Sequence, residues 1–354
     1  PYDGYALRAA DSAGASRENP VSLTVIGQSF AGKPAETEVG SGEAVQIMTG
    51  GVIPDGADCV LPQEKTDEGE WQVRIYKALE PYENYCRQGE DFLKAREIIP
   101  FGIPVTAAVA GVAASAGLTE LLVFPKPKIA VLSTGDELQS PELPLKKGQI
   151  YSSNTPYLSG RISELRMSVV QIAYVHDDVE EITRAFEAAS KISDIVICTG
   201  GVSAGKKDLV PEALNVLGAE IIFHGVEVKP GMPAALAMLE NKPLLALSGN
   251  PFACAVTFEL LARSAFSILA SNPLLEPVKL KSKLTVDCSK ARPVRRFLRG
   301  LAKDGGVSIS GEQGNGQLLT LIGSNCIVEL PAGNEPLITG THVDVYMLEG
   351  NTYG

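Results

Sequence analysis

The sequence of 354 residues lacks several features that would assign it to a class of protein at once. Six cysteines are present, but no two are spaced as C-x-x-C, so no zinc or dithiol redox motif occurs. Scattered cysteines of this kind are typical of free thiols in a reducing compartment. No apolar run approaches the roughly 20 residues that cross a bilayer as a helix, which argues against a membrane partner.

Basic residues are also scarce. Thirty-one lysines and arginines stand against 42 aspartates and glutamates, a formal net charge of −11. A surface of that sign repels phosphate backbones, which argues against nucleic acid as a partner. An anionic substrate must then be held by local groups, because the overall field opposes its approach. The chain has no signal-peptide pattern and begins within a motif, so we expect further residues before Pro1.

The composition is otherwise that of a globular protein with room for several cores. Residues 22–83 alternate short apolar runs with turn clusters, which predicts a small β domain. Residues 84–124 lead into an Ala-rich helical segment. Residues 125–272 alternate strand-like and helix-like segments, which predicts a doubly wound, mostly parallel α/β domain. Residues 273–354 return to strands and predict a small β-barrel-like domain.

Polar and glycine-rich sequence follows four of the predicted α/β strands. It occupies residues 134–137, 176–178, 199–208 and 248–251. Ligands of open α/β sheets bind past the carboxyl ends of the strands, so we expect a binding site where these segments meet.

The segment TGGVSAGKKD at 199–208 is the most informative of the four. Its glycines let backbone N–H groups approach an anion, and Thr199, Ser203 and the next helix N-terminus add donors for phosphate. The spacing is not that of a Walker A loop. A purely structural turn is the alternative interpretation.

Acidic residues are the second signal at this predicted rim. Asp136, Glu137, Asp177 and Asp208 would cluster there, and converging carboxylates are usually tolerated because a hard cation such as Mg²⁺ binds them. Helix capping is the alternative for Asp208 and for Asp178, since each precedes a predicted helix.

A lysine follows another predicted strand. Lys229, in VKPGMP, could reach an anionic substrate as a flexible point charge. A solvated turn lysine is the alternative.

An ordered set of motifs resembles the MoeA family, to which the gephyrin E domain is similar. The set covers roughly residues 1–260 and consists of PYDGYALR, VQIMTGGVIPDGADCVLPQE, RQGEDF, IAVLSTGDEL, GQIYSSN, HDD, DIVICTGGVSAGKKD, VKPGMP and LSGNP. The resemblance implies a linker domain split between residues 1–21 and 84–124, with a β domain (22–83) inserted into it. It further implies an α/β pterin-binding domain (125–272) and a C-terminal β domain (273–354).

The resemblance also implies an activity and its partners. The expected reaction inserts molybdenum into adenylylated molybdopterin, using molybdate, with hydrolysis of the adenylate and release of AMP. Mg²⁺ or a similar divalent ion would assist. The protein would be a cytoplasmic homodimer, with a cleft completed by the partner subunit, and it could serve other molybdenum-cofactor biosynthesis proteins.

Site residues are carried over by matching positions and joined to those found above. Catalytic roles are expected for acidic residues, a metal-binding role for three of the rim carboxylates, and substrate binding for hydroxyl, glycine and turn residues. The catalytic set is Asp3, Asp91, Glu137, Asp177 and Asp208; the metal set is Asp136, Glu137 and Asp208; the substrate set is Thr49, Thr199, Gly200, Gly201, Ser203, Gly205, Lys229, Ser248, Gly249, Asn250 and Pro251.

The chain departs from the family pattern at several positions. Tyr2 replaces a methionine, Cys86 an arginine, Gly225 a lysine and Lys206 a glutamate. A catalytically degenerate molybdopterin-binding or scaffold protein is therefore the alternative function. An enzyme that adenylylates molybdopterin is disfavoured by the additional β domains.

Overall fold

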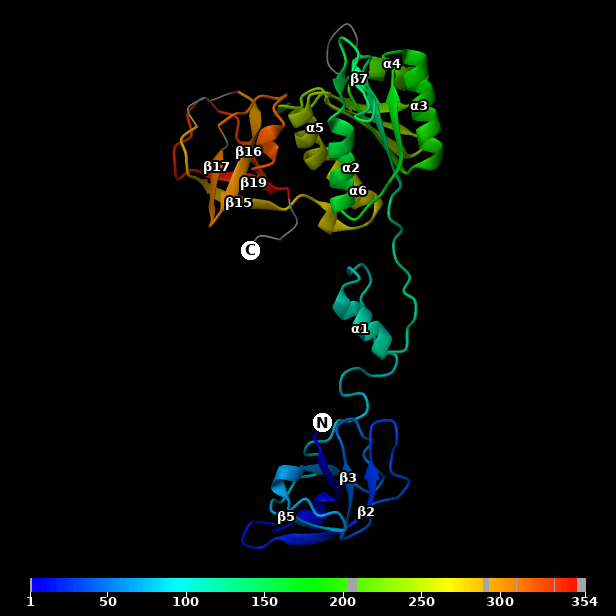
Figure 1. Cartoon of the computed structure of the whole chain (residues 1–354), viewed down its shortest axis with the longest axis vertical. Coiled ribbons are helices and arrows are strands. Elements are labelled where there is room, and N and C mark those ends of the chain that lie inside the picture. The colour runs from blue at the N-terminus through cyan, green and yellow to red at the C-terminus, as the bar shows by residue number, and fades with distance from the viewer. Residues whose placement is uncertain (1, 203–208, 289–292, 310, 334, 349–354) are drawn as a thin grey trace. The chain divides into compact units, whose positions relative to one another are not determined.

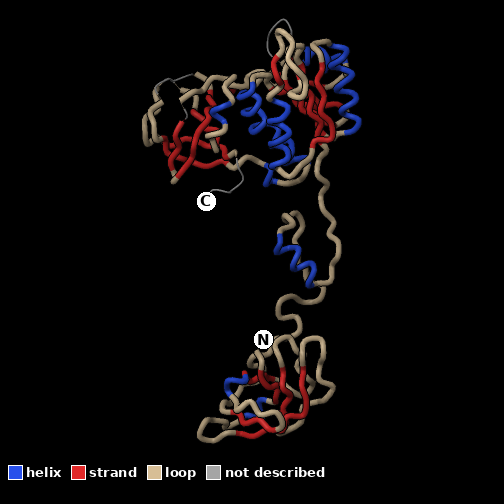
Figure 2. The backbone as a smooth tube through the Cα atoms, in the orientation of Figure 1, coloured by secondary structure: helices blue, strands red, loops and turns tan. Residues whose placement is uncertain are grey.

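The chain forms two compact units, Pro1–Pro100 and Phe101–Gly354. The computed structural model describes residues 2–202, 209–288, 293–309, 311–333 and 335–348. Figure 1 labels the elements along the chain, and Figure 2 distinguishes the strands from the helices. The four domain boundaries expected from the sequence stay a prediction.

The first unit is built on a five-stranded sheet with the order β4-β1-β3-β2-β5. The four apolar runs between residues 22 and 80 are strands, as predicted, and β1 joins them as an unpredicted strand beside β3 and β4. Gly4 permits this close pairing, because a Cβ there would stand 2.0 Å from the carbonyl oxygen of Leu61. The strands are β1 (Gly4–Leu7), β2 (Val21–Ser29), β3 (Glu43–Ile47), β4 (Cys59–Pro62) and β5 (Gln72–Ile75).

The Ala-rich segment forms a helix, α1 (Ala107–Ser115), as predicted. Thr106 caps it by accepting a hydrogen bond from the Val109 amide at 3.4 Å. Ala113 is its one buried residue, and no acidic or basic residue stands in its first or last turn. An apolar helix exposed along most of its length is a surface that another element or chain can cover.

The centre of the second unit is a six-stranded sheet with the order β11-β13-β14-β10-β6-β9. The four strands from β14 to β9 run parallel, and the β11–β13 and β13–β14 pairs are antiparallel. Every residue of β6 and β10 is buried, as expected of parallel strands covered on both faces. The strands are β6 (Ile129–Thr134), β9 (Val169–Val175), β10 (Ile195–Thr199), β11 (Glu220–His224), β13 (Ala235–Leu239) and β14 (Lys242–Leu247).

Helices cover both faces of this sheet, which confirms the doubly wound prediction (Figures 1 and 2). Phe186 and Val210, from α3 and α4, pack against one face of the sheet. Leu158 of α2 and Phe258, from a longer helical run, pack against the other face. The helices are α2 (Asn154–Glu164), α3 (Val179–Ile192), α4 (Leu209–Val216) and the run α5 (Pro251–Thr257), η3 (Phe258–Ala262) and α6 (Arg263–Leu269), in which η3 is a π-helical turn.

Among the described residues, one helical run, Pro251–Leu269, is both long enough and apolar enough to cross a membrane. Its most apolar window is 67% buried inside the protein, so the run is a core helix.

A buried acidic residue, Glu259, lies in the middle of this helical run. The Glu259 carboxylate accepts hydrogen bonds from Arg161 Nε at 2.8 Å and from Arg263 Nη1 at 3.0 Å.

The C-terminal region is a small closed barrel, as predicted. Its sheet has the order β12-β16-β17-β15-β19-β18, and a further pairing of β16 with β18 closes the ring. The short strand β12 (Val228–Lys229) leaves the α/β domain and pairs with the start of β16. The barrel strands are β15 (Lys279–Leu284), β16 (Arg295–Lys303), β17 (Gly306–Ile309), β18 (Cys326–Leu330) and β19 (His342–Met347).

The barrel is joined to the N-terminal end of α5. The Arg299 guanidinium lies 3.9 Å from the centre of the Phe252 ring. The same arginine donates hydrogen bonds to the carbonyl oxygens of Glu312 and Gly314. The Phe252 amide in turn donates to the Asn315 carbonyl oxygen at 3.0 Å. One loop of the barrel is therefore held beside the turn that begins α5.

We expect Glu259→Ala to lower the free energy of unfolding by about 3–5 kcal/mol, because the buried Arg263 loses its paired carboxylate and the buried Arg161 is left with only the exposed Glu164. Urea unfolding followed by circular dichroism measures the change. Glu187→Ala is the control, since it removes one carboxylate from an exposed pair with Lys191 on α3 and should leave the unfolding curve nearly unchanged. Equal curves for the two variants would contradict this account of the helix core.

Candidate functional site

The parallel register of β6, β10 and β14 brings three strand ends to one edge of the sheet. Thr199 at the end of β10 is paired with Ser133 on one side and with Leu247 on the other. The segments that follow these strands surround a cavity of about 490 Å³. That volume lies within the range of ligand pockets, which supports the site expected there from the sequence.

Nine residues singled out in the sequence line this cavity: Glu137, Asp177, Thr199, Gly200, Gly201, Ser248, Gly249, Asn250 and Pro251. Ser203, Gly205 and Asp208 lie outside the described residues, as does Lys206. The remaining wall comes from residues to which no role is assigned by sequence reasoning, among them Thr134, Ser152, Asn154 and Pro233.

The Gly200–Gly201 turn accounts for the tight floor of the cavity. Both glycines have positive φ, +99° and +61°. A Cβ on Gly200 would stand 2.3 Å from the Thr134 carbonyl oxygen, and one on Gly201 would stand 3.0 Å from Val210 Cγ2. Backbone therefore packs directly on backbone, and the turn exposes main chain that a side chain would otherwise shield.

Asn154 ties two of the strand-end segments together. Its Nδ2 donates hydrogen bonds to Thr199 Oγ1 and to the Gly249 carbonyl oxygen, both at 2.8 Å. Thr199 Oγ1 donates onward to the Ser248 carbonyl oxygen at 3.1 Å. The buried amide thus sets the spacing of the two loops. Its signal in the sequence is the polar end of GQIYSSN, whose last residue is Asn154, the first residue of α2.

The Thr134 hydroxyl is a buried polar atom beside the cavity. It lies at the cavity wall, the residue is only 4% exposed, and Oγ1 has no hydrogen-bond partner among the described residues. Buried polar groups usually have partners. A bound ligand or water that accepted its proton would satisfy this atom.

The rim carboxylates divide into two groups. Glu137 and Asp177 line the cavity, whereas Asp136 does not. Asp136 Oδ1 accepts a hydrogen bond from the Asp177 amide at 3.2 Å and lies 3.3 Å from His176 Nδ1. Asp178 caps α3 through the Glu181 amide at 2.9 Å, so capping explains this residue. The described residues contain no group of three His, Cys, Asp or Glu side chains placed to hold a metal ion.

Three predicted residues lie in the first unit. Asp3 Oδ1 accepts a hydrogen bond from the Thr49 amide at 2.7 Å, so the fold brings these two together. The hydrogen bonds from Thr49 hold the pKa of Asp3 below its usual value. Asp91 is an exposed loop residue.

Lys229 does not line the cavity. It is an exposed residue of β12, where it pairs with Arg296 of the barrel. Pro233, four residues later in the same turn, is the one that reaches the cavity wall. Two of the departures from the family pattern, Cys86 and Gly225, are exposed.

Three family models match successive parts of the chain. Residues 1–117 match "MoeA N-terminal region (domain I and II)", and residues 281–348 match "MoeA C-terminal region (domain IV)". Between them, residues 130–267 match "Probable molybdopterin binding domain", and this segment contains all the residues that line the cavity described above.

Similar proteins span nearly the whole chain. A Staphylococcus epidermidis protein named molybdopterin molybdenumtransferase is 35% identical over 100% of this chain and 85% of its own length. A Staphylococcus aureus protein of the same name is also 35% identical, over 99% of this chain. The crystal structure of a molybdopterin biosynthesis MoeA protein from Pyrococcus horikoshii matches 99% of this chain and 87% of its own chain, with a TM-score of 0.86 and 30% identity. The chain belongs to the MoeA family.

Proposed function

We propose that this chain inserts molybdenum from molybdate into adenylylated molybdopterin, with hydrolysis of the adenylate and release of AMP. The observation that carries the proposal is the cavity at the carboxyl edge of the α/β sheet, inside the segment that matches the molybdopterin-binding model. Relatives that are 35% identical over essentially the whole chain bear the name molybdopterin molybdenumtransferase. A cytoplasmic location accompanies this assignment.

The cavity can hold an anionic pterin phosphate through main-chain groups. The Gly200–Gly201 turn and the Gly249–Asn250 segment both border it. Backbone N–H groups at such turns favour phosphate oxygens. Such local donors are needed because the chain carries a net charge of −11.

The carboxylates that line the cavity can bind a divalent cation that is also bound by the substrate phosphates. Mg²⁺ is usually held by one or two carboxylates together with substrate phosphates. Glu137 and Asp177 line the cavity and can fill that role, with Asp208 as a third ligand in the proposal. The cation, when bound, would neutralise charge on the pyrophosphate and on the departing AMP.

The chain's own residues have distinct parts in the proposed reaction. Water attacks the phosphorus of the adenylate, the bond to the pterin phosphate breaks, and AMP leaves with the new oxygen. Asp177 orients the water or the cation from the end of β9, while Asn154 keeps the β10 and β14 loops in register. Lys229 screens substrate charge from outside the cavity wall.

We also propose that the protein acts as a homodimer. The support is the segment around α1, where Phe101, Leu122 and Val123 are exposed together with most of the helix. Contiguous exposed apolar surface marks an interaction site. Asp3, Thr49 and Asp91 keep the catalytic and substrate-binding roles that family membership implies.

The principal experiment measures AMP release from adenylylated molybdopterin in the presence of molybdate and Mg²⁺. We expect release that depends on both, and we expect Asp177→Asn and Asp208→Ala to reduce it at least about a hundredfold, as the loss of a positioned catalytic group does. Asp178→Asn is the matched control, because asparagine caps a helix as well as aspartate does.

One other outcome of this experiment would reject the proposed function, and a second would reject the role given to Asp177. Tight pterin binding without AMP release would identify the chain as a molybdopterin carrier or scaffold, as the Cys86 and Gly225 departures allow. Equal losses in the Asp177→Asn and Asp178→Asn variants would remove Asp177 from the mechanism.

A second prediction concerns Asn154. We expect Asn154→Ala to lower kcat/KM for AMP release about tenfold or more, because Thr199 Oγ1 and the Gly249 carbonyl oxygen lose their shared donor and the loops lose their spacing. Asn215→Ala, on the exposed side of α4, should leave kcat/KM unchanged. A folded Asn154→Ala protein with normal kcat/KM would show that the loops need no such tie.

A third prediction concerns assembly. We expect Ala110→Glu on the exposed side of α1 to convert the dimer to monomer in sedimentation velocity, because a charge would be buried at the interface. Glutamate is a good helix former, so α1 itself should persist. Ala188→Glu, on the exposed side of α3, is the control. A monomeric parent protein, or a dimer that tolerates Ala110→Glu, would contradict this interface.

A further inference from the structure

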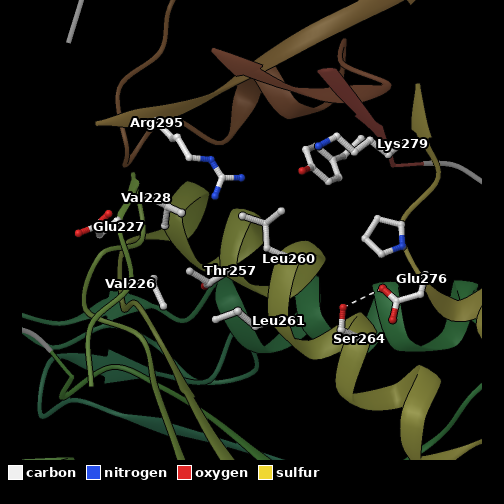
Figure 3. Close-up of a pocket in the computed structure, with 12 residues that line it drawn as sticks. Val226, Glu227, Val228, Thr257, Leu260, Leu261, Ser264, Glu276, Lys279 and Arg295 are labelled. Carbon is white, nitrogen blue, oxygen red and sulfur yellow. Dashed lines mark hydrogen bonds between the residues drawn. The ribbon is translucent and has the colours of Figure 1, made fainter. Parts of the chain in front are cut away.

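A second cavity lies where the barrel meets the helical run α5–η3–α6 (Figure 3). Its volume is about 510 Å³, and it shares no lining residue with the cavity at the sheet edge. The helical run contributes Leu260, Leu261 and Ser264 from below, and the barrel contributes Arg295 and other residues from above. The proposed molybdenum chemistry leaves this cavity without a role.

Arg295 presents a guanidinium to one end of the cavity. Its Nε donates a hydrogen bond to Glu329 Oε1 at 2.7 Å, and the Nη groups point into the cavity (Figure 3). Glu329 is held from its other side by Tyr346 Oη, which donates to Oε2 at 2.7 Å. The arginine is thus oriented from behind, and the Nη side of a guanidinium is suited to the two oxygens of a carboxylate.

The Arg295–Glu329 pair is charged at neutral pH. Burial by itself would raise the pKa of Glu329, but the hydrogen bonds from Arg295 and Tyr346 hold that pKa below its usual value. The hydrogen bond to Glu329 also raises the pKa of Arg295. Both members of the pair are therefore ionised over the physiological pH range, and the guanidinium still presents its Nη groups to the cavity (Figure 3).

A carboxylate stands at the opposite end. Glu276 Oε2 accepts a hydrogen bond from Ser264 Oγ at 2.7 Å, and Figure 3 shows this pair across the cavity from Arg295. Ser264 fixes the orientation of the acid from α6. A carboxylate held in this way is a site for an ammonium group or another charged donor.

The surface between the two ends is largely aliphatic. Val226, Val228, Leu260 and Leu261 line it. Thr257 also reaches the wall, but its hydroxyl donates to the Ala253 carbonyl oxygen at 2.8 Å within the helix. The middle of a bound molecule would therefore meet apolar atoms, which favours a chain of methylene groups.

The lining carries charges of both signs. Glu227 and Glu276 are acidic, and Arg295 and Lys279 are basic, but Lys279 is paired with Asp344 at 3.0 Å. A purely anionic ligand would meet the two acids, and a purely cationic one would meet the Arg295 guanidinium. A ligand with one charge of each sign avoids both conflicts.

We propose that this cavity binds a small zwitterionic molecule with an aliphatic middle, its carboxylate held by Arg295 and its ammonium group by Glu276. Recognition requires both ends at once, so the length of the aliphatic chain decides affinity. The cavity volume lies within the range that accommodates a small organic ligand.

Straight-chain ω-amino carboxylic acids of increasing length are the probes, with binding to the whole protein measured by isothermal titration calorimetry. We expect affinity to pass through a maximum at one chain length. The fatty acid and the alkylamine of that length, which each lack one charged end, should bind about tenfold or more weakly. Equal binding of the fatty acid or the alkylamine would overturn the proposal, and so would the absence of binding at every length.

Variants test the two ends separately. Glu276→Gln keeps an acceptor for Ser264 but loses the charge, and Arg295→Gln loses the guanidinium; each should weaken the best probe about tenfold. Lys303→Gln, exposed at the far end of β16, is the control and should bind normally. If Arg295→Gln does not fold, the probe affinity of the Glu276→Gln variant tests the proposal by itself. A folded Glu276→Gln protein with unchanged affinity would overturn the assignment.

Discussion

The parallel pairing of β6, β10 and β14 is the constraint on which the rest of the α/β domain depends. Because adjacent parallel strands end at the same edge, the segments after Thr134, Thr199 and Leu247 must meet there. The three segments that follow these strands are therefore packed closely together. Glycines at 200, 201 and 249 make this packing possible, because a side chain at any of these positions would collide with neighbouring backbone or side-chain atoms or press against them. The cavity is what remains open between these turns.

The helical run from Pro251 to Leu269 serves three structural purposes. Its first turn borders the sheet-edge cavity, its apolar face fills the core beneath β14, and its far side forms the floor of the cavity under the barrel. Because most of its surface contacts other parts of the protein, this helical run has few exposed polar positions. Its acidic residue, Glu259, is buried, and the guanidinium groups of Arg161 and Arg263 compensate the carboxylate charge. The barrel is held to the same run through Arg299 and Phe252.

Much of the fold and part of the candidate site could be predicted from the sequence. Strand-like runs, the Ala-rich helix and the closed C-terminal barrel follow from apolar periodicity and turn residues. The strand-end rule placed Glu137, Asp177 and the 199–201 turn at one edge, where they are found. Features that are short, or that depend on contacts with residues distant in the sequence, could not be predicted in this way. β1 is four residues long and depends on Gly4 beside Leu61, and Asn154 looks like any polar residue at the start of a helix until its two acceptors are in place. The backbone pairing of Lys229 with the barrel was likewise not predicted.

The sequence by itself determined which segments become strands or helices, and its ordered motifs determined the family, because local periodicity and motif order are properties of the chain alone. Tertiary structure decided which side chains share a space. Asn154 lies 45 residues from Thr199 and 95 from Gly249, yet one amide bonds to both. Arg295 and Glu276 face one cavity only because the barrel docks on α5 and α6. Such contacts depend on how elements pack, and packing is a property of the whole fold rather than of any stretch of sequence.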